Sequence, residues 1–273
     1  MKQSAMTQAT EEKPLKILQI TDLHILPEAG DTMLGIDTEH YVQAVVQQAR
    51  TDNHYDLVLV TGDLTQHPCP ASYQRILAEL EKLHTPCLCL PGNHDDLALM
   101  QQVFRGPVIS CEKQVILAGW QIICLNSQIP GSPCGRLNAA ELEFLESCLR
   151  QHPEHFAMIA VHHHCLPTNS EWMDTMQIEN SAELLELLAR YPKARAITFG
   201  HIHQDLHSKL DNLEIFAAPA TCFQFKLDSR EFALEQTPPG YRSFSLHPDG
   251  RITSEVLRLP GLLSELQMNS EGY

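Results

Sequence analysis

Five groups of polar residues follow short apolar runs, and their side chains are of the kinds that bind metal ions. The groups are Asp22-Leu23-His24, Thr61-Gly62-Asp63, Pro91-Gly92-Asn93-His94-Asp95, His162-His163-His164 and Gly200-His201-Ile202-His203. Open α/β sheets bind ligands at the carboxyl ends of their strands, so groups that end successive strands should meet there. Carboxylate, imidazole and amide ligands without a thiolate suit Mn, Fe, Zn or Co, and they differ from the cysteine ligands of structural zinc sites. We therefore predict a metal centre.

The spacing within the groups supports coordination. Residues two apart in an extended strand point to the same side, so we expect Asp22 and His24 to converge on one ion, and His201 and His203 to do likewise. A glycine precedes a candidate ligand at positions 62, 92 and 200, where it would let the backbone turn sharply beside a crowded site. One such group is common by chance, but five in succession, each at a strand end, indicate a functional site.

Short apolar runs alternate with helical patterns, which predicts a layered α/β architecture. The predicted strands cover residues 15–20, 57–60, 87–90, 156–161, 194–199 and 213–217, with hairpins over 115–125 and 241–257. The predicted helices cover residues 38–50, 72–83, 97–104 and 138–151, and another follows Asn180. Asn138 with Glu141, and Asn180 with Glu183, have the spacing of a capping box. We expect a disordered lead-in over 1–14, one domain over 15–260 with a loop-rich insert at 224–239, and a C-terminal tail over 261–273.

The composition disfavours several classes of function. Asp and Glu number 34 against 19 Lys and Arg, a formal charge of −15 that repels nucleic acid and anionic membranes where no basic cluster overrides it. The sequence has no run of about 18 apolar residues, the length a transmembrane helix needs. The 9 cysteines form no C-x-x-C pair, which favours free thiols in a reducing compartment. We predict a cytoplasmic monomer or homodimer that binds neither nucleic acid nor membranes.

The ordered motifs D-x-H, G-D, G-N-H-[DE], H and G-H-x-H resemble those of the calcineurin-like metallophosphoesterases over residues 15–203. The resemblance implies a four-layer α/β fold, with a central β-sandwich flanked by helices. It also implies two metal ions, with Fe and Mn favoured and Zn or Co possible. One ion would be bound by Asp22, His24, Asp63 and His203, and the other by Asp63, Asn93, His162 and His201. Asp63 would then bridge the two ions.

By the same resemblance, His94 would not bind metal but would face the substrate phosphate and the leaving oxygen. A histidine so placed can donate a proton to, or stabilise, the departing alkoxide. Asp95 could orient His94, or could cap a helix that begins at Asp96. Among the three histidines at 162–164, His162 directly follows the apolar run and aligns best with the family histidine, while His164 would share its face if the strand continued. Cys165 stands where related sequences usually have proline.

A narrower resemblance, to the bacterial class III cyclic-AMP phosphodiesterases, extends along nearly the whole chain. Its segments are 18–22, 163–167 with 172–174, 219–226, 239–242 and 270–273. It implies that a metal-bridged hydroxide hydrolyses 3′,5′-cyclic AMP to 5′-AMP, lowering intracellular cyclic AMP. The implied substrate contacts are His24, Asp63, Asn93, His94 and His203.

Three aromatic residues could form a base site. Trp172, Phe223 and Phe225 are candidates to stack on adenine, or they could pack in the core or in a lid. Two further readings of the whole chain stay open from the residues. One is a phosphodiesterase or phosphomonoesterase of broad specificity, and the other is an inactive metallophosphoesterase fold that serves as a scaffold.

Overall fold

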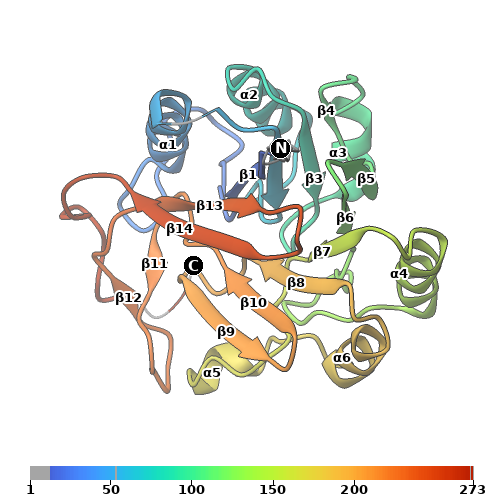
Figure 1. Ribbon diagram of the computed structural model, residues 1–273. Helices are drawn as coiled ribbons and strands as arrows, with labels where there is room; N and C mark the ends of the chain where they lie inside the picture. The colour runs from blue at the N-terminus through green and yellow to red at the C-terminus, as the bar shows by residue number, and fades with distance from the viewer. Residues whose placement is uncertain (1–12, 53, 271, 273) are drawn as a thin grey trace, which may run out of the picture.

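Two six-stranded sheets stack face to face in the computed structural model, which describes residues 13–52, 54–270 and 272 (Figure 1). The first sheet has the order β14 (Ile252–Arg258), β13 (Gly240–Leu246), β1 (Leu15–Ile20), β2 (Leu57–Thr61), β3 (Cys87–Leu90) and β4 (Ile109–Ser110). The second has the order β5 (Gln114–Leu117), β6 (Trp120–Cys124), β7 (Phe156–Ala160), β8 (Ala194–Phe199), β10 (Leu213–Ala217) and β9 (Leu206–Leu210).

Each sheet is parallel at its centre. Strands β1 to β4 run parallel in the first sheet, and so do β6, β7, β8 and β10 in the second. The antiparallel hairpin β13–β14 extends the first sheet beside β1, and antiparallel β5 and β9 form the two edges of the second. Parallel strands need helical crossovers that cover the sheet faces, which is why the central strands read as continuous apolar runs.

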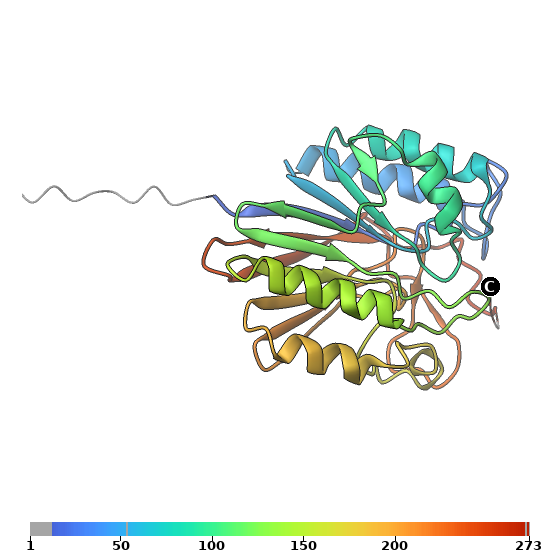
Figure 2. The same cartoon turned by 90° about the vertical axis from the view of Figure 1, so that its right-hand side faces the viewer.

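The helices lie on the outer faces of the two sheets. Figure 2 shows α1 (Thr38–Asp52), α2 (Pro70–Glu81) and α3 (Leu97–Val103) over the first sheet, with α4 (Ala139–Gln151) and α6 (Ser181–Ala189) over the second. One core cluster lies between the sheets and includes Trp120, Phe216 and Phe244. The other two fill the spaces between each sheet and its helices. The expected four-layer fold with a central β-sandwich is thus confirmed. Among the described residues, no helix has the length and apolar character needed to cross a membrane.

Some local expectations were wrong. Asn138 does cap α4, since its side chain accepts a hydrogen bond from the Glu141 amide. Asn180 makes no such bond at α6, because its amide group instead pairs with both the backbone nitrogen and the carbonyl oxygen of Leu137. A long-range contact has therefore replaced the local cap.

The regions expected to be loops also contain structure. The insert at 224–239 holds a small hairpin of β11 (Gln224–Phe225) and β12 (Leu234–Glu235), and the short helix α5 (Glu171–Asp174) precedes α6. Most of the expected lead-in, residues 1–12, lies outside the described residues. In the expected tail, Leu263 and Leu266 pack into the core cluster beside the second sheet.

Candidate metal centre

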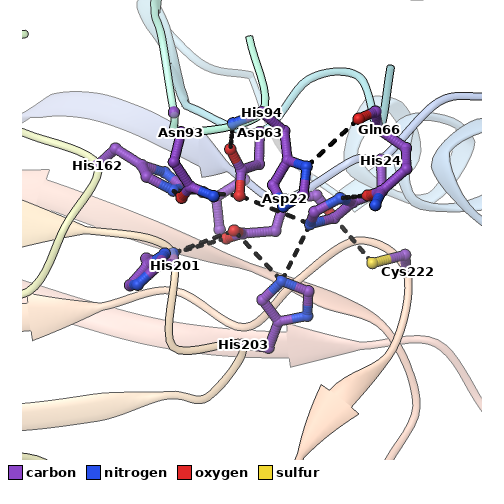
Figure 3. A network of polar contacts seen from close by, with 12 residues as sticks. Asp22, His24, Asp63, Gln66, Asn93, His94, His162, His201, His203 and Cys222 are labelled. Carbon is purple, nitrogen blue, oxygen red and sulfur yellow. Dashed lines mark hydrogen bonds and ion pairs between the residues drawn. The ribbon is translucent and has the colours of Figure 1, made fainter. Parts of the chain in front are cut away.

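The candidate ligands lie together in the loops that follow five parallel strands. Asp22 and His24 follow β1, Asp63 follows β2, and Asn93 follows β3. The remaining candidates, His162, His201 and His203, follow β7 and β8 of the second sheet. Figure 3 shows all seven side chains converging on one buried region, with His94 beside them. The two sheets therefore each contribute ligand groups from the same end of the sandwich.

The backbone reason for this convergence differs from the one expected. Asp22, His24, Asp63, His201 and His203 have φ values of 52°, 47°, 49°, 64° and 47°, so each adopts the left-handed conformation and none is extended. Non-glycine residues rarely adopt this conformation, and such strain concentrates at functional sites. Hydrogen bonds between loops hold it in place: the Asp22 amide donates to Gly62 O and the His24 amide to Asp63 O, each at 3.0 Å. The period-two explanation of the spacing is therefore wrong, although the ligands do converge.

Close packing explains the glycines. A Cβ atom on Gly62 would lie 2.3 Å from His162 Nδ1, and one on Gly92 would lie 2.1 Å from Asp63 Oδ1. On Gly200, a Cβ atom would lie 2.0 Å from Thr21 Oγ1. None of these distances is compatible with a side chain, so the expected close approach of backbone to ligand is confirmed.

The candidate ligand atoms form two groups that share Asp63. In the first group, His24 Nε2 lies 3.2 Å from His203 Nε2, which lies 3.4 Å from Asp22 Oδ1. In the second, His162 Nε2 lies 3.2 Å from Asn93 Oδ1. Oδ2 of Asp63 lies 3.8 Å from His24 Nε2 and 3.2 Å from His162 Nε2, so the same oxygen faces both groups.

Hydrogen bonds on the outer side of three imidazoles set their tautomers. The Nδ1–H group of His24 donates to Gln66 Oε1 at 2.7 Å. That of His162 donates to Thr61 O, and that of His203 to Phe223 O, each at 2.8 Å. In each ring Nε2 is then the nitrogen directed at the centre. Such partners are the usual second layer around metal-binding histidines. Gln66 was not anticipated, because no sequence pattern links it to His24.

This arrangement fits metal ions. Nε2 of His24 and Nε2 of His203 lie 3.2 Å apart in a buried site, so two ring nitrogens are directed at one position, as the ligands of one cation are. His201 Nε2 is buried and has no hydrogen-bond partner among the described residues. Buried polar atoms are nearly always paired, so this orphaned imidazole nitrogen is a candidate to bind a metal ion. The donor set of carboxylate, imidazole and amide is that of a divalent or trivalent cation.

The charges of the ligand groups are shifted by burial and by one another. Burial alone would raise the pKa of Asp63, but His162 and then His94 hold it well below its usual range. Burial opposes the charge on His162, yet Asp63 raises the pKa of this histidine to about 9. Burial lowers the pKa of His24 to about 3 and that of His201 well below its usual value. Asp63 is therefore ionised and His24 and His201 are neutral, the forms that bind metal, while His162 would release a proton on binding an ion.

His94 lies at the edge of the ligand groups. Its backbone amide donates to Asp63 Oδ1 at 2.9 Å, and its Nδ1 donates to Gln66 O at 3.3 Å. It lines an adjoining cavity and, like Asn93, is only partly buried, whereas the other metal-ligand candidates are buried. This position, beside the ligands but open to a substrate, is the one a proton donor requires.

The expected role of Asp95 as a helix cap was wrong. Its carboxylate accepts hydrogen bonds from the backbone amides of Leu64, Thr65 and Gly92 at 3.1, 3.2 and 2.9 Å. It thereby connects the loops after β2 and β3. The helix cap is Asp96, whose side chain accepts from the Leu99 amide, and α3 begins at Leu97.

The three consecutive histidines have different surroundings. His162 is the one whose ring meets Asp63. His163 Nδ1 lies 2.7 Å from Ser127 Oγ, and a ring nitrogen of His163 lies within 4.8 Å of ligand atoms of His162 and His201. His164 is fully buried, and its two ring nitrogens have no hydrogen-bond partner in the described part of the chain. Adjacency to His162 was the only sequence signal for His163.

The aromatic candidates separate into two kinds. Phe223 and Phe225 are buried and pack against the His203 ring, with ring centroids 4.9 and 4.2 Å away. The two phenylalanines therefore pack against a candidate metal ligand. Trp172 lines the cavity next to His94.

Cys222 was not anticipated near the centre. Its thiol donates to Asp22 O at 3.1 Å, and burial raises the pKa of this thiol well above the usual value.

Comparison with known proteins agrees with this geometry. The chain matches the calcineurin-like phosphoesterase family over residues 15–205. It is 37% identical to the 3′,5′-cyclic adenosine monophosphate phosphodiesterase CpdA of Haemophilus influenzae, over 100% of both chains. It is 38% identical to the protein of the same name from Escherichia coli K12, over 96% of both chains. A Nostoc 3′,5′-cyclic-nucleotide phosphodiesterase is 36% identical over 92% of this chain and 94% of its own.

Solved structures show the same fold at low sequence identity. A dimetal phosphatase from Danio rerio has a TM-score of 0.62 at 12% identity, covering 90% of this chain and 99% of its own. The protein TT1561 of Thermus thermophilus has a TM-score of 0.58 at 12% identity, again over 90% and 99%. With the family match and relatives of this identity along the full length, the chain belongs to the calcineurin-like phosphoesterase family.

Proposed function

We propose that this protein hydrolyses 3′,5′-cyclic AMP to 5′-AMP at a centre of two metal ions. The observation that carries the proposal is the shared position of Asp63 Oδ2, which faces two groups of buried ligand atoms at once. Relatives at 37% and 38% identity along the whole chain, both described as 3′,5′-cyclic AMP phosphodiesterases, support the substrate. An inactive scaffold would have no need for a complete ligand set with His94 beside it.

The proposed ligands divide into two sites. Asp22, His24, Asp63 and His203 would hold the first ion; Asp63, Asn93, His162 and His201 would hold the second. The contacts of His203 with His24 and Asp22, the contacts of His162 with Asn93 and Asp63, and the orphaned Nε2 of His201 near His162 support this division. We propose Fe or Mn as the ions, with Zn or Co as alternatives that the same ligand types accept.

Two such ions, when bound, acidify a water molecule and neutralise the charge that develops on the phosphate. The chain's own residues then determine which bond breaks. Forming 5′-AMP requires cleavage between phosphorus and the 3′-oxygen, so this oxygen leaves and must gain a proton. We assign that proton to His94, whose Nδ1–H donates to Gln66 O and whose side chain lines the cavity beside the candidate ligands. Asn93, His24, Asp63 and His203 would surround the phosphate.

Further properties of the chain support an intracellular role. All nine cysteines are free thiols, which suits the reducing conditions of the cytoplasm, where we propose that the enzyme lowers cyclic AMP. The net charge of −15 disfavours a nucleic acid substrate. We propose that the protein acts as a monomer or homodimer.

The test is an assay of metal-supplemented enzyme with product identification. Cyclic AMP, cyclic GMP, bis(p-nitrophenyl) phosphate and a phosphomonoester are compared at equal enzyme concentration. We expect cyclic AMP to give the highest kcat/KM and 5′-AMP as product. If the simple esters are cleaved faster than cyclic AMP, the chain is a broad phosphoesterase and the substrate assignment fails.

A further inference from the structure

A cavity of about 360 Å³ adjoins the metal centre, and the reaction described above does not use most of it. Its lining includes Asn93, His94 and His201, which places it directly beside the candidate metal ligands. The rest of the lining comes from two other segments: Gly131, Ser132 and Pro133, and Trp172, Met173 and Met176. The volume falls within the range of about 300–1,000 Å³ that small-molecule sites occupy.

The two segments that line the far part of the cavity are joined to each other. The Gly135 amide donates to Gln177 O at 3.3 Å, and the Glu179 amide donates to Gly135 O at 2.8 Å. The Cys134 thiol also donates to Thr175 O at 3.3 Å. These bonds connect the loop after β6 with the turn after α5, so the cavity has walls held in place before a ligand arrives.

The Trp172 ring is held by aromatic packing on its outer side. Its centroid lies 5.0 Å from that of Phe225 at an interplanar angle of 86°, and 5.3 Å from that of Phe232 at 72°. Phe225 in turn stacks on His203, with centroids 4.2 Å apart. The position of the indole is thus coupled through one ring to a candidate metal ligand.

The chemistry of the lining selects a flat and uncharged group. Beyond the centre it offers an indole, two thioethers, a proline ring and one hydroxyl, and the lining residues include no Asp, Glu, Lys or Arg. Aromatic and thioether groups bind aromatic rings by stacking and by sulfur–aromatic contact. A second phosphate or a carboxylate would find no counter-ion there.

We propose that this cavity holds the nucleobase of the cyclic nucleotide, with the indole of Trp172 as its stacking surface and Met176 beside it. The inference rests on the proposed function, because a cyclic nucleotide whose phosphate lies at the metal centre has its base one ribose away. It also assigns different roles to the aromatic candidates. Trp172 contacts the base, while Phe223 and Phe225 are buried behind His203 and do not.

The kinetic test compares a substrate that has a base with one that lacks it. Trp172→Leu removes the stacking surface, and Trp172→Phe retains it. Stacking of one base on an aromatic ring changes affinity by about 5- to 100-fold, so we expect Trp172→Leu to raise KM for cyclic AMP by that factor. Trp172→Phe should stay within about threefold of wild type, and both variants should cleave ribose 3′,5′-cyclic phosphate at the wild-type rate. Equal losses on both substrates, or no loss on cyclic AMP, would overturn the proposal.

Fluorescence provides a readout that does not depend on turnover. The chain has 2 tryptophans, and Trp120 is fully buried between the sheets with its Nε1–H donating to His247 O. Only Trp172 lines the cavity, so 5′-AMP should quench its emission with saturation while ribose 5-phosphate should not. Unchanged emission at saturating 5′-AMP would refute the base site. Failure of wild-type enzyme to hydrolyse cyclic AMP, with quenching intact, would refute only the proposed function.

Discussion

Gly62→Ala should disturb the centre without removing any ligand. Gly62 has φ +94°, and an added Cβ atom would lie 2.3 Å from His162 Nδ1 and 2.8 Å from the Gly92 nitrogen. His162 Nδ1 is the atom that donates to Thr61 O at 2.8 Å, so the methyl group would push on the bond that orients this ring. The ring would shift away from Asp63 Oδ2, now 3.2 Å from His162 Nε2.

The expected cost has two parts. Placing alanine in the left-handed region costs about 1–2 kcal/mol. Overpacking a tight interior adds typically about 1–3 kcal/mol. The free energy of unfolding should therefore fall by about 2–5 kcal/mol, a large part of the roughly 5–15 kcal/mol that a protein usually has. Activity should fall at least about tenfold, because displacing a catalytic group by about 1 Å costs about 100-fold.

Gly119→Ala is the matched control. Gly119 also has a positive φ, +80°, but a Cβ atom there would meet nothing within 4 Å. It should therefore carry the backbone cost alone, about 1–2 kcal/mol, and retain full activity. Urea unfolding of both variants in EDTA measures stability without the contribution of bound metal. If Gly62→Ala loses no more stability and activity than Gly119→Ala, the close approach of Gly62 to His162 does not limit the site.

Three further predictions concern the ligands and the proton donor. Asp63→Asn should abolish activity and deplete both ions, because its oxygen faces both groups; retention of two ions with near-normal turnover would disprove the shared position. His203→Ala and Asn93→Ala should each remove one ion, and anomalous scattering should show that the two ions differ. His94→Ala should keep both ions and lose about 10²–10⁴-fold in rate on cyclic AMP but much less on p-nitrophenyl esters, whose leaving group hardly needs a proton; equal losses on both would indicate phosphate positioning instead.

Metal removal completes the set. EDTA should abolish activity, and Mn or Fe should restore it. Mild reductant should have little inhibitory effect, because all nine cysteines are free thiols. Strong inactivation by reductant of a Mn-loaded enzyme, which has no ferric ion to reduce, would contradict the free-thiol assignment.

The fold class and the place where the candidate ligands gather could both be predicted from the amino-acid sequence. The central strands are buried on both faces, so their apolar runs are continuous and easily recognised, as in β2 and β3. Parallel strands end at one edge, so polar residues after each run had to lie near one another. The position directly after the apolar run favoured His162 among three neighbours, and in the structure its Nε2 lies 3.2 Å from Asp63 Oδ2.

The orientation of the candidate ligand side chains, by contrast, depends on contacts between loops that are far apart in the sequence. The left-handed backbone at Asp22, His24 and Asp63 depends on hydrogen bonds between loops, such as Asp22 to Gly62, which no local spacing contains. An extended strand, in which residues two apart share a side, and a left-handed turn would both bring these side chains together, so the sequence could not distinguish the two. The role of Asp95 between two loops could not be predicted either, because its partners Leu64 and Thr65 are 31 and 30 residues away along the chain.

Side chains distant in sequence also decided the surroundings of the centre. Gln66 sets the tautomer of His24 from 42 residues away, and Phe223 O sets that of His203 from 20 residues away. Trp172 and Phe225 are both aromatic residues near family motifs, so sequence alone offered no way to separate them. Packing separates them, because Phe225 is buried against His203 while Trp172 lines the open cavity. Residue type is a local property, but burial and orientation belong to the folded chain as a whole.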